Sequence, residues 1–337
     1  MILYQKGNAP PLEVTLRAAE RKDADQIISC IRDAYGETYV KQFLYTPEGI
    51  AHCEESGELS FSVAEDAQGE LAGITAYERS EHFPGLAEIA CQVIRRKYNG
   101  YGLALPLALH AMGRAEELPF TGQFARALGC HLISQKTLKG MGFTACGFLL
   151  NVFDKSLFLH RFENGDYAKI PQSVAVKRQG KSDAGSVWVP AELASLAEAV
   201  YRDLGMSWTR GEAGALSGED LWSREEDPAH ATLALWARSC GETFSQRLEA
   251  ELSAVRGRAG QTVNLYLNLT CPGSSAAYEA AVGQGFFATG FLPCGQDGEY
   301  LILHHPLDVP VVVENIQHIP EYAPFMEHIR RQLWKTQ

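Results

Sequence analysis

The sequence predicts an α/β (α+β) fold, in which helices flank a mixed and mostly antiparallel central sheet. Three observations lead to this class. Apolar stretches with strand character alternate with segments whose apolar residues recur at helical spacing. A glycine-containing loop joins one such strand, 87–94, to one such helix, 103–118. The order of elements in the first half of the chain recurs more weakly in the second half, which predicts two units.

The first half reads as a strand, two helices, three strands, a helix, a strand, a helix and a strand. Thr46 and Pro47 open the second helix, because threonine is a frequent N-cap and proline fits the first helical turn. Asp66 to Gly69 predict a hairpin turn between two strands. The expected segments are 14–18, 21–34, from 47, 59–64, 71–77, 87–94, 103–118, 120–127, 131–139 and 144–153.

The second half repeats this alternation from about residue 170. We expect strands at 173–177, 232–237, 263–269, 290–293 and 300–304, and helices at 190–203, 242–255 and 274–284. Ser274 or Ser275 would cap the last of these helices. A further helix, 319–334, would pack on its own domain, with a neighbouring subunit as the alternative. The predicted domains are therefore 1–160 and 161–337, although 156–337 could instead be an unrelated α/β domain.

The loop from Lys97 to Gly102 is the strongest functional signal. Glycine allows the backbone to approach a ligand closely, and the first N–H groups of the following helix have no intrahelical partner. Together with the helix dipole, they predict a cradle for a diphosphate. The dinucleotide fingerprint would need a third glycine where Leu105 stands, and the P-loop pattern is absent. An ordinary strand-to-helix turn is the alternative.

The loop resembles the acetyl-CoA loop of the GNAT (GCN5-related N-acetyltransferase) superfamily: a basic residue, two spacers, glycine, one spacer and glycine. The order of elements over residues 13–155 and the pair Gly142-Phe143 after the last helix are also similar to that family. The resemblance implies an acyl-CoA-dependent N-acyltransferase that moves an acetyl group from acetyl-CoA to an amine of a small molecule or peptide. It implies these coenzyme-binding residues: Val93, Ile94, Lys97, Tyr98, Asn99, Gly100, Tyr101, Gly102, Leu103 and Ser134.

The resemblance also suggests catalytic residues. Glu88, at the start of the strand before the loop, would be the general base that deprotonates the amine. The alternative is a surface glutamate at the edge of the strand. The general acid of the family is a tyrosine four residues before the closing Gly-Phe, and Leu138 stands there instead. His131, at the start of the next helix, could be an acid or merely a helix cap. Among aromatic residues near the acceptor side, Tyr35, Tyr39 and Tyr45 could line a pocket or fill the core.

The second unit departs from the family at its own loop. Arg238 to Thr243 contain one glycine, Gly241, and Glu242 would place a carboxylate beside any phosphate. We therefore expect a tandem pair whose second, C-terminal unit is degenerate. Because Leu138 leaves the acid unassigned, a non-catalytic acyl-CoA sensor or interaction module is a second hypothesis. An amino-acyl or long-chain acyl transferase is a third.

Composition narrows the classes of partner. The 337-residue chain has a net charge of −11 and no long basic run, which argues against nucleic-acid binding. No apolar run approaches a membrane span, and no signal peptide is apparent, so we expect a cytoplasmic protein without membrane contact. The eight cysteines are scattered without a C-x-x-C pair, so no metal is expected. In His304-His305, one ring should point inward and the other outward. The oligomeric state stays open.

Overall fold

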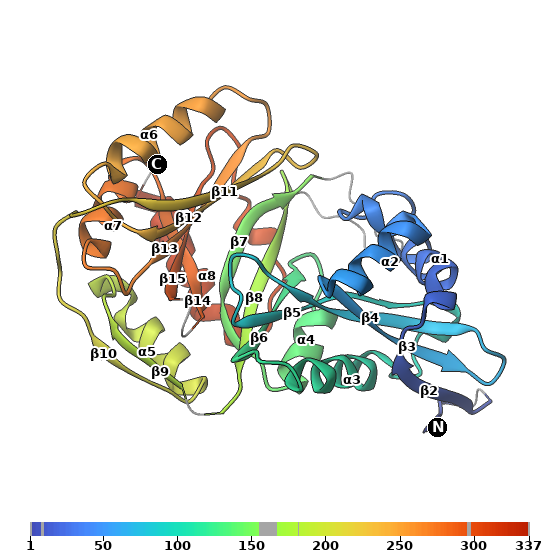
Figure 1. Ribbon diagram of the computed structural model, residues 1–337. Coiled ribbons are helices and arrows are strands. Elements are labelled where there is room, and N and C mark those ends of the chain that lie inside the picture. The colour runs from blue at the N-terminus through green and yellow to red at the C-terminus, as the bar shows by residue number, and fades with distance from the viewer. Residues whose placement is uncertain (1, 8–9, 155–166, 181, 295–297, 336–337) are drawn as a thin grey trace. The chain divides into compact units, whose positions relative to one another are not determined.

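The computed structural model describes residues 2–7, 10–154, 167–180, 182–294 and 298–335. Its contacts divide the chain into two compact units (Figure 1). The described part of unit 1 is 2–7, 10–125 and 137–142, and that of unit 2 is 126–136, 143–154 and most of 167–335. The predicted domain boundary after residue 160 lies in 155–166, outside the described residues.

Unit 1 contains a sheet in the order β1-β2-β3-β4-β5-β6. Neighbouring strands are antiparallel except β5 and β6, which are parallel where Leu86, Ala87 and Glu88 face Gly122, Gln123 and Phe124. The elements are β1 (Ile2–Tyr4), β2 (Leu12–Ala18), α1 (Ala24–Tyr35), α2 (Pro47–Ser56), β3 (Leu59–Asp66), β4 (Leu71–Arg79), β5 (Leu86–Ile94), α3 (Ala104–Glu116) and β6 (Gly122–Leu128), with the last three residues of β6 assigned to unit 2.

The helices of unit 1 cover both faces of its sheet (Figure 1). On one face, apolar residues of α1 and α2 pack on Phe61, Val63 and Ile74. On the other face, Leu103 and Leu107 pack on Ala64 and Ala72 at the start of α3. The mixed, mostly antiparallel sheet flanked by helices confirms the predicted fold class.

Local capping agrees with the residues that begin and end each element. Thr46 Oγ1 accepts the N–H of Gly49, and Pro47 occupies the first turn of α2, as predicted. Asp66 Oδ1 accepts the N–H groups of Gln68 and Glu70, which closes the β3–β4 hairpin. This hairpin turn therefore places Glu70 at a defined position next to β4.

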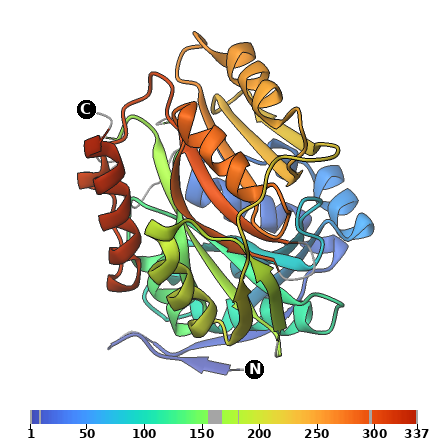
Figure 2. The ribbon, with the colours of Figure 1, turned by 90° about the vertical axis from the view of Figure 1, so that its left-hand side faces the viewer.

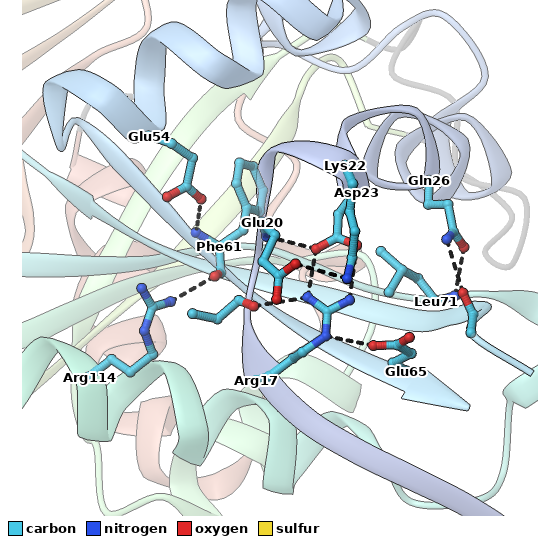
Figure 3. Close-up of polar contacts among 12 residues, drawn as sticks. Arg17, Glu20, Lys22, Asp23, Gln26, Glu54, Phe61, Glu65, Leu71 and Arg114 are labelled. Carbon is cyan, nitrogen blue, oxygen red and sulfur yellow. Dashed lines mark hydrogen bonds and ion pairs between the residues drawn. The ribbon is translucent and has the colours of Figure 1, made fainter. Parts of the chain in front are cut away.

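A buried ion pair joins β2 to the start of α1. Arg17 donates two hydrogen bonds to the Asp23 carboxylate, at 2.6 and 2.9 Å, and a third to Glu65 (Figure 3). Asp23 is 1 % exposed. Burial alone would raise the pKa of this carboxyl, but Arg17 and the N–H of Glu20 outweigh that cost and lower it. The pair therefore stabilises unit 1 only while Asp23 is ionised.

Unit 2 contains strands in the order β8-β7-β14-β15-β13-β12-β11, together with a separate parallel pair of β9 and β10. Adjacent strands in the order from β8 to β11 are antiparallel, except β12 and β13, which are parallel. The strands are β7 (Thr144–Phe153), β8 (Ile170–Arg178), β9 (Ser182–Val187), β10 (Met206–Arg210), β11 (Leu221–Asp227), β12 (Thr232–Ser239), β13 (Thr262–Asn268), β14 (Phe287–Pro293) and β15 (Glu299–His305).

The helices of unit 2 pack on these strands. They are α5 (Ala194–Asp203), α6 (Phe244–Val255), α7 (Ser274–Gly283) and α8 (Ala323–Lys335). Figure 2 shows α5 and α7 in front of the sheet, where α5 contacts β7 and α7 contacts β13. The C-terminal helix α8 contacts β14 and β7, so it packs on its own unit as predicted. Helix α4 (Ile133–Gly140) is divided between the two units.

The second half differs from expectation in its added strands and in one helix cap, and agrees with it in the His304-His305 pair. The strands β9, β10 and β11 were missed, because β11 is polar along most of its length and β10 is largely exposed. The predicted cap by Ser274 or Ser275 is wrong: Gly273 is the N-cap of α7, and both serines lie inside the helix. His304 is fully buried and His305 partly exposed, which confirms one ring inward and one outward.

Candidate functional site

The loop between β5 and α3 has the glycine geometry that the sequence predicted. Gly100 and Gly102 have φ angles of +87° and +79°, in the left-handed region that glycine tolerates. A single 3₁₀ turn, Arg96–Tyr98, precedes them, and Leu103 is the N-cap of α3. A Cβ atom added to Gly102 would meet nothing within 4 Å, so open space lies above this glycine.

The start of α3 presents unsatisfied backbone donors. In the part of the chain that the structure describes, the N–H groups of residues 100–105 have no hydrogen-bond acceptor, and Leu103 contributes no side-chain cap. The next residue, Pro106, has no N–H at all. A helix end without such acceptors can bind an anion, because the donors and the helix dipole point the same way.

The cations of the loop are already engaged by acidic residues from elsewhere in unit 1. Glu70, in the β3–β4 hairpin, accepts hydrogen bonds from Arg95 at 2.6 Å and from Lys97. The Lys97–Glu70 bond raises the pKa of Lys97. Arg96 donates to the main-chain carbonyl of Asp33. Lys97 is about half exposed and lies at the surface, so an arriving phosphate would compete with Glu70 for it.

Tyr98 anchors the loop to the core rather than presenting its ring to solvent. Its side chain is 5 % exposed and packs with Val14 and Leu103. Its hydroxyl donates to Asp66, and burial together with that carboxylate raises the pKa of Tyr98 to about 12. Tyr98 can therefore contribute to a ligand only through its backbone. Tyr101 donates to the carbonyl of Pro10 at 3.2 Å. Asn99, with an extended ψ of 140°, leads from the 3₁₀ turn into Gly100.

Strand β5 carries a bulge just before the loop. Ile74 faces Val93 and Ala76 faces Ala90, so two residues of β5, Cys91 and Gln92, lie opposite one residue of β4. Cys91 has a φ of +52°, which is unusual for a residue other than glycine. Bulges of this kind occur beside active sites, where they turn the strand and terminate pairing. The Gln92 side chain donates to the carbonyl of Ala104 at 2.8 Å, which ties the bulge to the start of α3.

The backbone beyond the bulge offers a further donor. Arg95 N–H donates to Ala72 O of β4 at 3.0 Å. Successive residues of an antiparallel strand direct their N–H groups to opposite sides, so the Ile94 N–H points away from β4. The Val93 side chain packs against the α1 and α2 core, and Ile94 packs toward α3. Ile94 N–H is therefore the group of this pair that could contact a ligand.

A buried polar cluster lies on the α1 side of the bulge. Glu88 of β5 faces Glu78 of β4 and is 7 % exposed. Lys41, from the segment after α1, donates to Glu78 at 2.6 Å. Burial favours the neutral amine, but the nearby carboxylates, Glu78 foremost and Glu88 also, outweigh it and raise the pKa of Lys41. Tyr39 Oη lies 3.0 Å from Cys91 Sγ at the bulge itself.

The three aromatic residues near this cluster belong mainly to the core. Tyr39 is 9 % exposed, and its ring lies 4.8 Å from that of Tyr35. Tyr45 accepts the N–H of Tyr39 through its hydroxyl. Tyr35 and Tyr45 are partly buried against the α1 and α2 cluster. Filling the core is thus the role that the packing supports.

The predicted residues at the start of α4 have separate environments. His131 is 9 % exposed, and its Nδ1 accepts the N–H of Ile133 at 3.3 Å, as a helix cap does. Ser134 is partly exposed on the first turn. Gln135 is used by its own unit, since it donates to Gln317 O and accepts from Ile319 N–H. Leu138 is 6 % exposed. Glu88 and His131 fall in different units.

The corresponding loop of unit 2 is closed by its own chain. Asp220 accepts the N–H of Gly241 at 2.6 Å and the hydroxyl of Thr243, at the start of α6. A Cβ on Gly241 would approach backbone atoms of residues 218–220 to 2.5 Å. A carboxylate of the protein thus occupies the position at this helix start where an anion would bind.

Several members of these clusters were missed by sequence reasoning. Glu70, Lys41, Glu78 and Asp220 are far in the chain from the residues they contact, and no local spacing marks them. Among the described residues, no group of three or more histidine, cysteine, aspartate or glutamate side chains could hold a metal ion. Within the same ranges, every helix is too short or too polar to span a bilayer.

About half of the chain is similar in structure to known proteins. No protein-family model matches, and a search of curated proteins found no match. An N-acetyltransferase from Staphylococcus aureus Mu50 is 18 % identical with a TM-score of 0.40, over 49 % of this chain and 98 % of that one. A spermidine/spermine N-acetyltransferase from Vibrio cholerae, in mutant form, is 19 % identical with a TM-score of 0.39, over 49 % and 94 %.

A third structure was solved with its cofactor acetyl-CoA. It is a proposed acetyltransferase from Salmonella typhimurium, 13 % identical with a TM-score of 0.40, over 49 % of this chain and 94 % of that one. The solved structures that half of the chain resembles are thus acetyltransferases, and one of the matches, from Desulfovibrio desulfuricans, is described as a member of the GNAT family.

Proposed function

We propose that the chain is an acyl-CoA-dependent N-acetyltransferase whose donor site lies in unit 1. The observation that carries the proposal is the row of N–H groups at residues 100–105, which have no acceptor among the described residues and open onto free space at Gly102. A coenzyme A diphosphate supplies the acceptors that these donors lack. Lys97 and Arg95 add positive charge once phosphate displaces Glu70 from them.

The bulge positions the reacting end of the coenzyme. A thioester carbonyl beside Ile94 would accept the N–H that points away from β4, and this contact would stabilise the negative charge that develops on the carbonyl oxygen. Gln92 holds this part of β5 against the start of α3. The same short segment therefore supports both the diphosphate and the carbonyl. Val93 contributes backbone, and its buried side chain fixes the strand.

Glu88 is the proposed general base. It lies three residues before the bulge and faces Glu78, so two carboxylates stand beside Lys41 on the α1 side of the sheet. Carboxylates in a buried setting favour a cationic amine as the acceptor, and Glu88 can take the proton of that amine directly or through water. Loss of the proton converts the ammonium group into the nucleophile that attacks the thioester.

His131 is the proposed general acid for the departing thiolate. Because Nδ1 accepts the Ile133 N–H, the proton of the neutral ring sits on Nε2, from which it can be donated. Ser134, on the first turn of α4, would hold an amide of the pantetheine arm.

Unit 2 is proposed to be the degenerate member of a tandem pair. Each unit contains a strand, a glycine-containing loop, a helix and a second strand parallel to the first, namely β5-α3-β6 and β12-α6-β13. The two loops differ in what occupies the helix start: free donors in unit 1, and Asp220 in unit 2. We therefore expect one coenzyme per chain.

The proposal is tested by titrating the protein with acetyl-CoA in a calorimeter and then offering the complex a panel of amines. The expected result is one binding event per chain and release of coenzyme A with at least one amine, measured by chromatography. Absence of heat and of any thermal shift at millimolar acetyl-CoA would refute the donor site. Binding without turnover across the panel would favour an acyl-CoA sensor, the reading that the buried Leu138 supports.

A further inference from the structure

Two cysteines of unit 2 meet where neighbouring strands end. Cys240 directly follows β12, and Cys271 comes three residues after β13. The two strands are parallel neighbours, with Ala237 opposite Leu267, so their outgoing loops begin side by side. The sulfur atoms lie 3.1 Å apart, and both cysteines are free thiols.

We propose that Cys240 and Cys271 form a thiol modification site, at which a hydroperoxide converts the pair into a reversible disulfide. The sulfurs need to approach by only about 1 Å to reach the bond length of a disulfide, near 2.05 Å. The parallel register already brings the two loops together, so the approach needs side-chain rotation and a small loop shift. This site is separate from the proposed donor site and rests on none of its residues.

Cys271 is the residue of the pair suited to react first. Of the eight cysteines it alone is partly exposed, while the other seven are buried. Its thiolate would accept a hydrogen bond from the Cys240 thiol, which lowers the pKa of Cys271; burial opposes this effect, and the N–H groups of Cys271 and Gly273 assist it. In the neutral pair, the Cys271 thiol donates a hydrogen bond to the carbonyl oxygen of Asn268, at 3.2 Å.

The remaining thiols are less reactive for a physical reason. Burial raises the pKa of Cys30 and Cys91 to about 12, and that of Cys53 and Cys130 to about 11. A thiol with a raised pKa holds little thiolate near neutral pH, and the thiolate is the species that attacks a peroxide. Peroxide should therefore select Cys271.

Peroxide oxidises the cysteine pair in two steps. The Cys271 thiolate attacks one oxygen of hydrogen peroxide, the O–O bond breaks, and Cys271 becomes a sulfenic acid while hydroxide leaves and takes a proton. The Cys240 sulfur then attacks the sulfenic sulfur, the S–O bond breaks, and water leaves as the disulfide forms. Two thiols are oxidised by two electrons, and one peroxide is reduced to two waters. A dithiol reductant reverses the bond.

The bond would tie the closed loop of unit 2 to the start of α7. Cys240 adjoins Gly241, which Asp220 holds, and Cys271 lies two residues before the Gly273 cap. The ring closed by the bond would contain α6 and β13. A cross-link of this kind lowers the conformational entropy of the unfolded chain, so the oxidised protein should melt at a higher temperature than the reduced one.

The experiment uses the full chain, first reduced and freed of reductant, then exposed to hydrogen peroxide and blocked with N-ethylmaleimide. Chymotrypsin can cleave at Tyr278, which separates Cys271 from Cys294 before mass spectrometry. The expected result is a Cys240–Cys271 cross-linked peptide, a loss of about 2 Da for two hydrogens, and recovery of both thiols with dithiothreitol. The oxidised form should show the higher melting temperature.

Two variants test which cysteines form the cross-link. In Cys240→Ser, oxidation should stop at a sulfenic acid on Cys271 that dimedone captures. In the matched control Cys294→Ser, which removes another buried thiol, the cross-link should form as before. The proposal is overturned if both Cys240 and Cys271 still react with maleimide after peroxide, or if peroxide oxidises another cysteine first. The measurement on the unaltered chain does not depend on either variant folding.

Discussion

Replacing Gly102 with alanine tests the proposed diphosphate cradle most directly. The φ angle of +79° makes any L-residue strained there, at about 1–2 kcal/mol. The new Cβ would meet no atom within 4 Å, so the fold should survive with a melting temperature lowered by about 2–8 °C. The methyl group would, however, project into the space proposed for phosphate.

The expected loss of affinity is larger than the loss of stability. If the methyl group displaces phosphate from two N–H groups, each hydrogen bond to a charged group is worth about 1.5–3 kcal/mol. A loss of about 3 kcal/mol weakens acetyl-CoA binding about 100-fold, which calorimetry resolves readily.

A matched control separates strain from ligand contact. Gly57, the C-cap of α2, has a φ of +71°, and a Cβ there would lie 4.0 Å from the Arg79 side chain. Gly57→Ala should therefore cost similar stability without changing acetyl-CoA affinity. Equal affinity of Gly102→Ala and the unaltered protein would refute the reasoning, because the coenzyme would then not approach this glycine.

Four further predictions follow from individual contacts. Glu88→Gln should lower kcat about 100-fold or more in an acetylation assay and leave acetyl-CoA affinity unchanged, as expected for loss of a general base; unchanged kcat would exclude that role. Glu70→Gln should tighten acetyl-CoA binding severalfold in calorimetry, since Arg95 and Lys97 lose their competing carboxylate. Asp23→Asn should cost about 3 kcal/mol of unfolding free energy at pH 7. Because the folded pKa of Asp23 is lowered, its contribution is full above the ordinary aspartate pKa and disappears as pH falls through the folded value. In urea unfolding, the unfolding free energies of the Asn variant and the unaltered chain should therefore become equal at acid pH. Asp220→Ala should lower the unfolding free energy by about 1–2 kcal/mol, because Gly241 and Thr243 lose their cap; a melting curve that does not move would contradict this.

Prediction from sequence succeeded where a signal is local. Helix spacing, the Thr46-Pro47 start and the Asp66 to Gly69 turn depend on residues a few positions apart, and the structure confirms each. The Gly100 and Gly102 conformations follow for the same reason, since only the residue itself limits its φ. Elements without a strong local pattern were missed, as in β11, whose exposed and charged residues lack a clear alternation.

The candidate site was predictable in part. Glu88 and the loop could be proposed from the sequence because they lie beside a recognisable strand and helix. The charged partners of these residues could not be predicted from the sequence. Lys41, Glu70 and Glu78 come close to Glu88 and the loop only through sheet pairing and loop packing. Tyr98 shows the same limit: its place in the loop suggested ligand contact, whereas its ring is buried and its hydroxyl bound to Asp66.

By itself, the sequence determined the class of fold, the glycine loop and the donors at the start of a helix, because these depend on backbone geometry within a few residues. Only the tertiary structure decided which helix starts stay open. The Asp220 side chain caps one, whereas the N-cap residue of the other, Leu103, makes no side-chain cap hydrogen bond. It also decided which thiols meet, because Cys240 and Cys271 are brought together by the register of two parallel strands and not by their spacing along the chain.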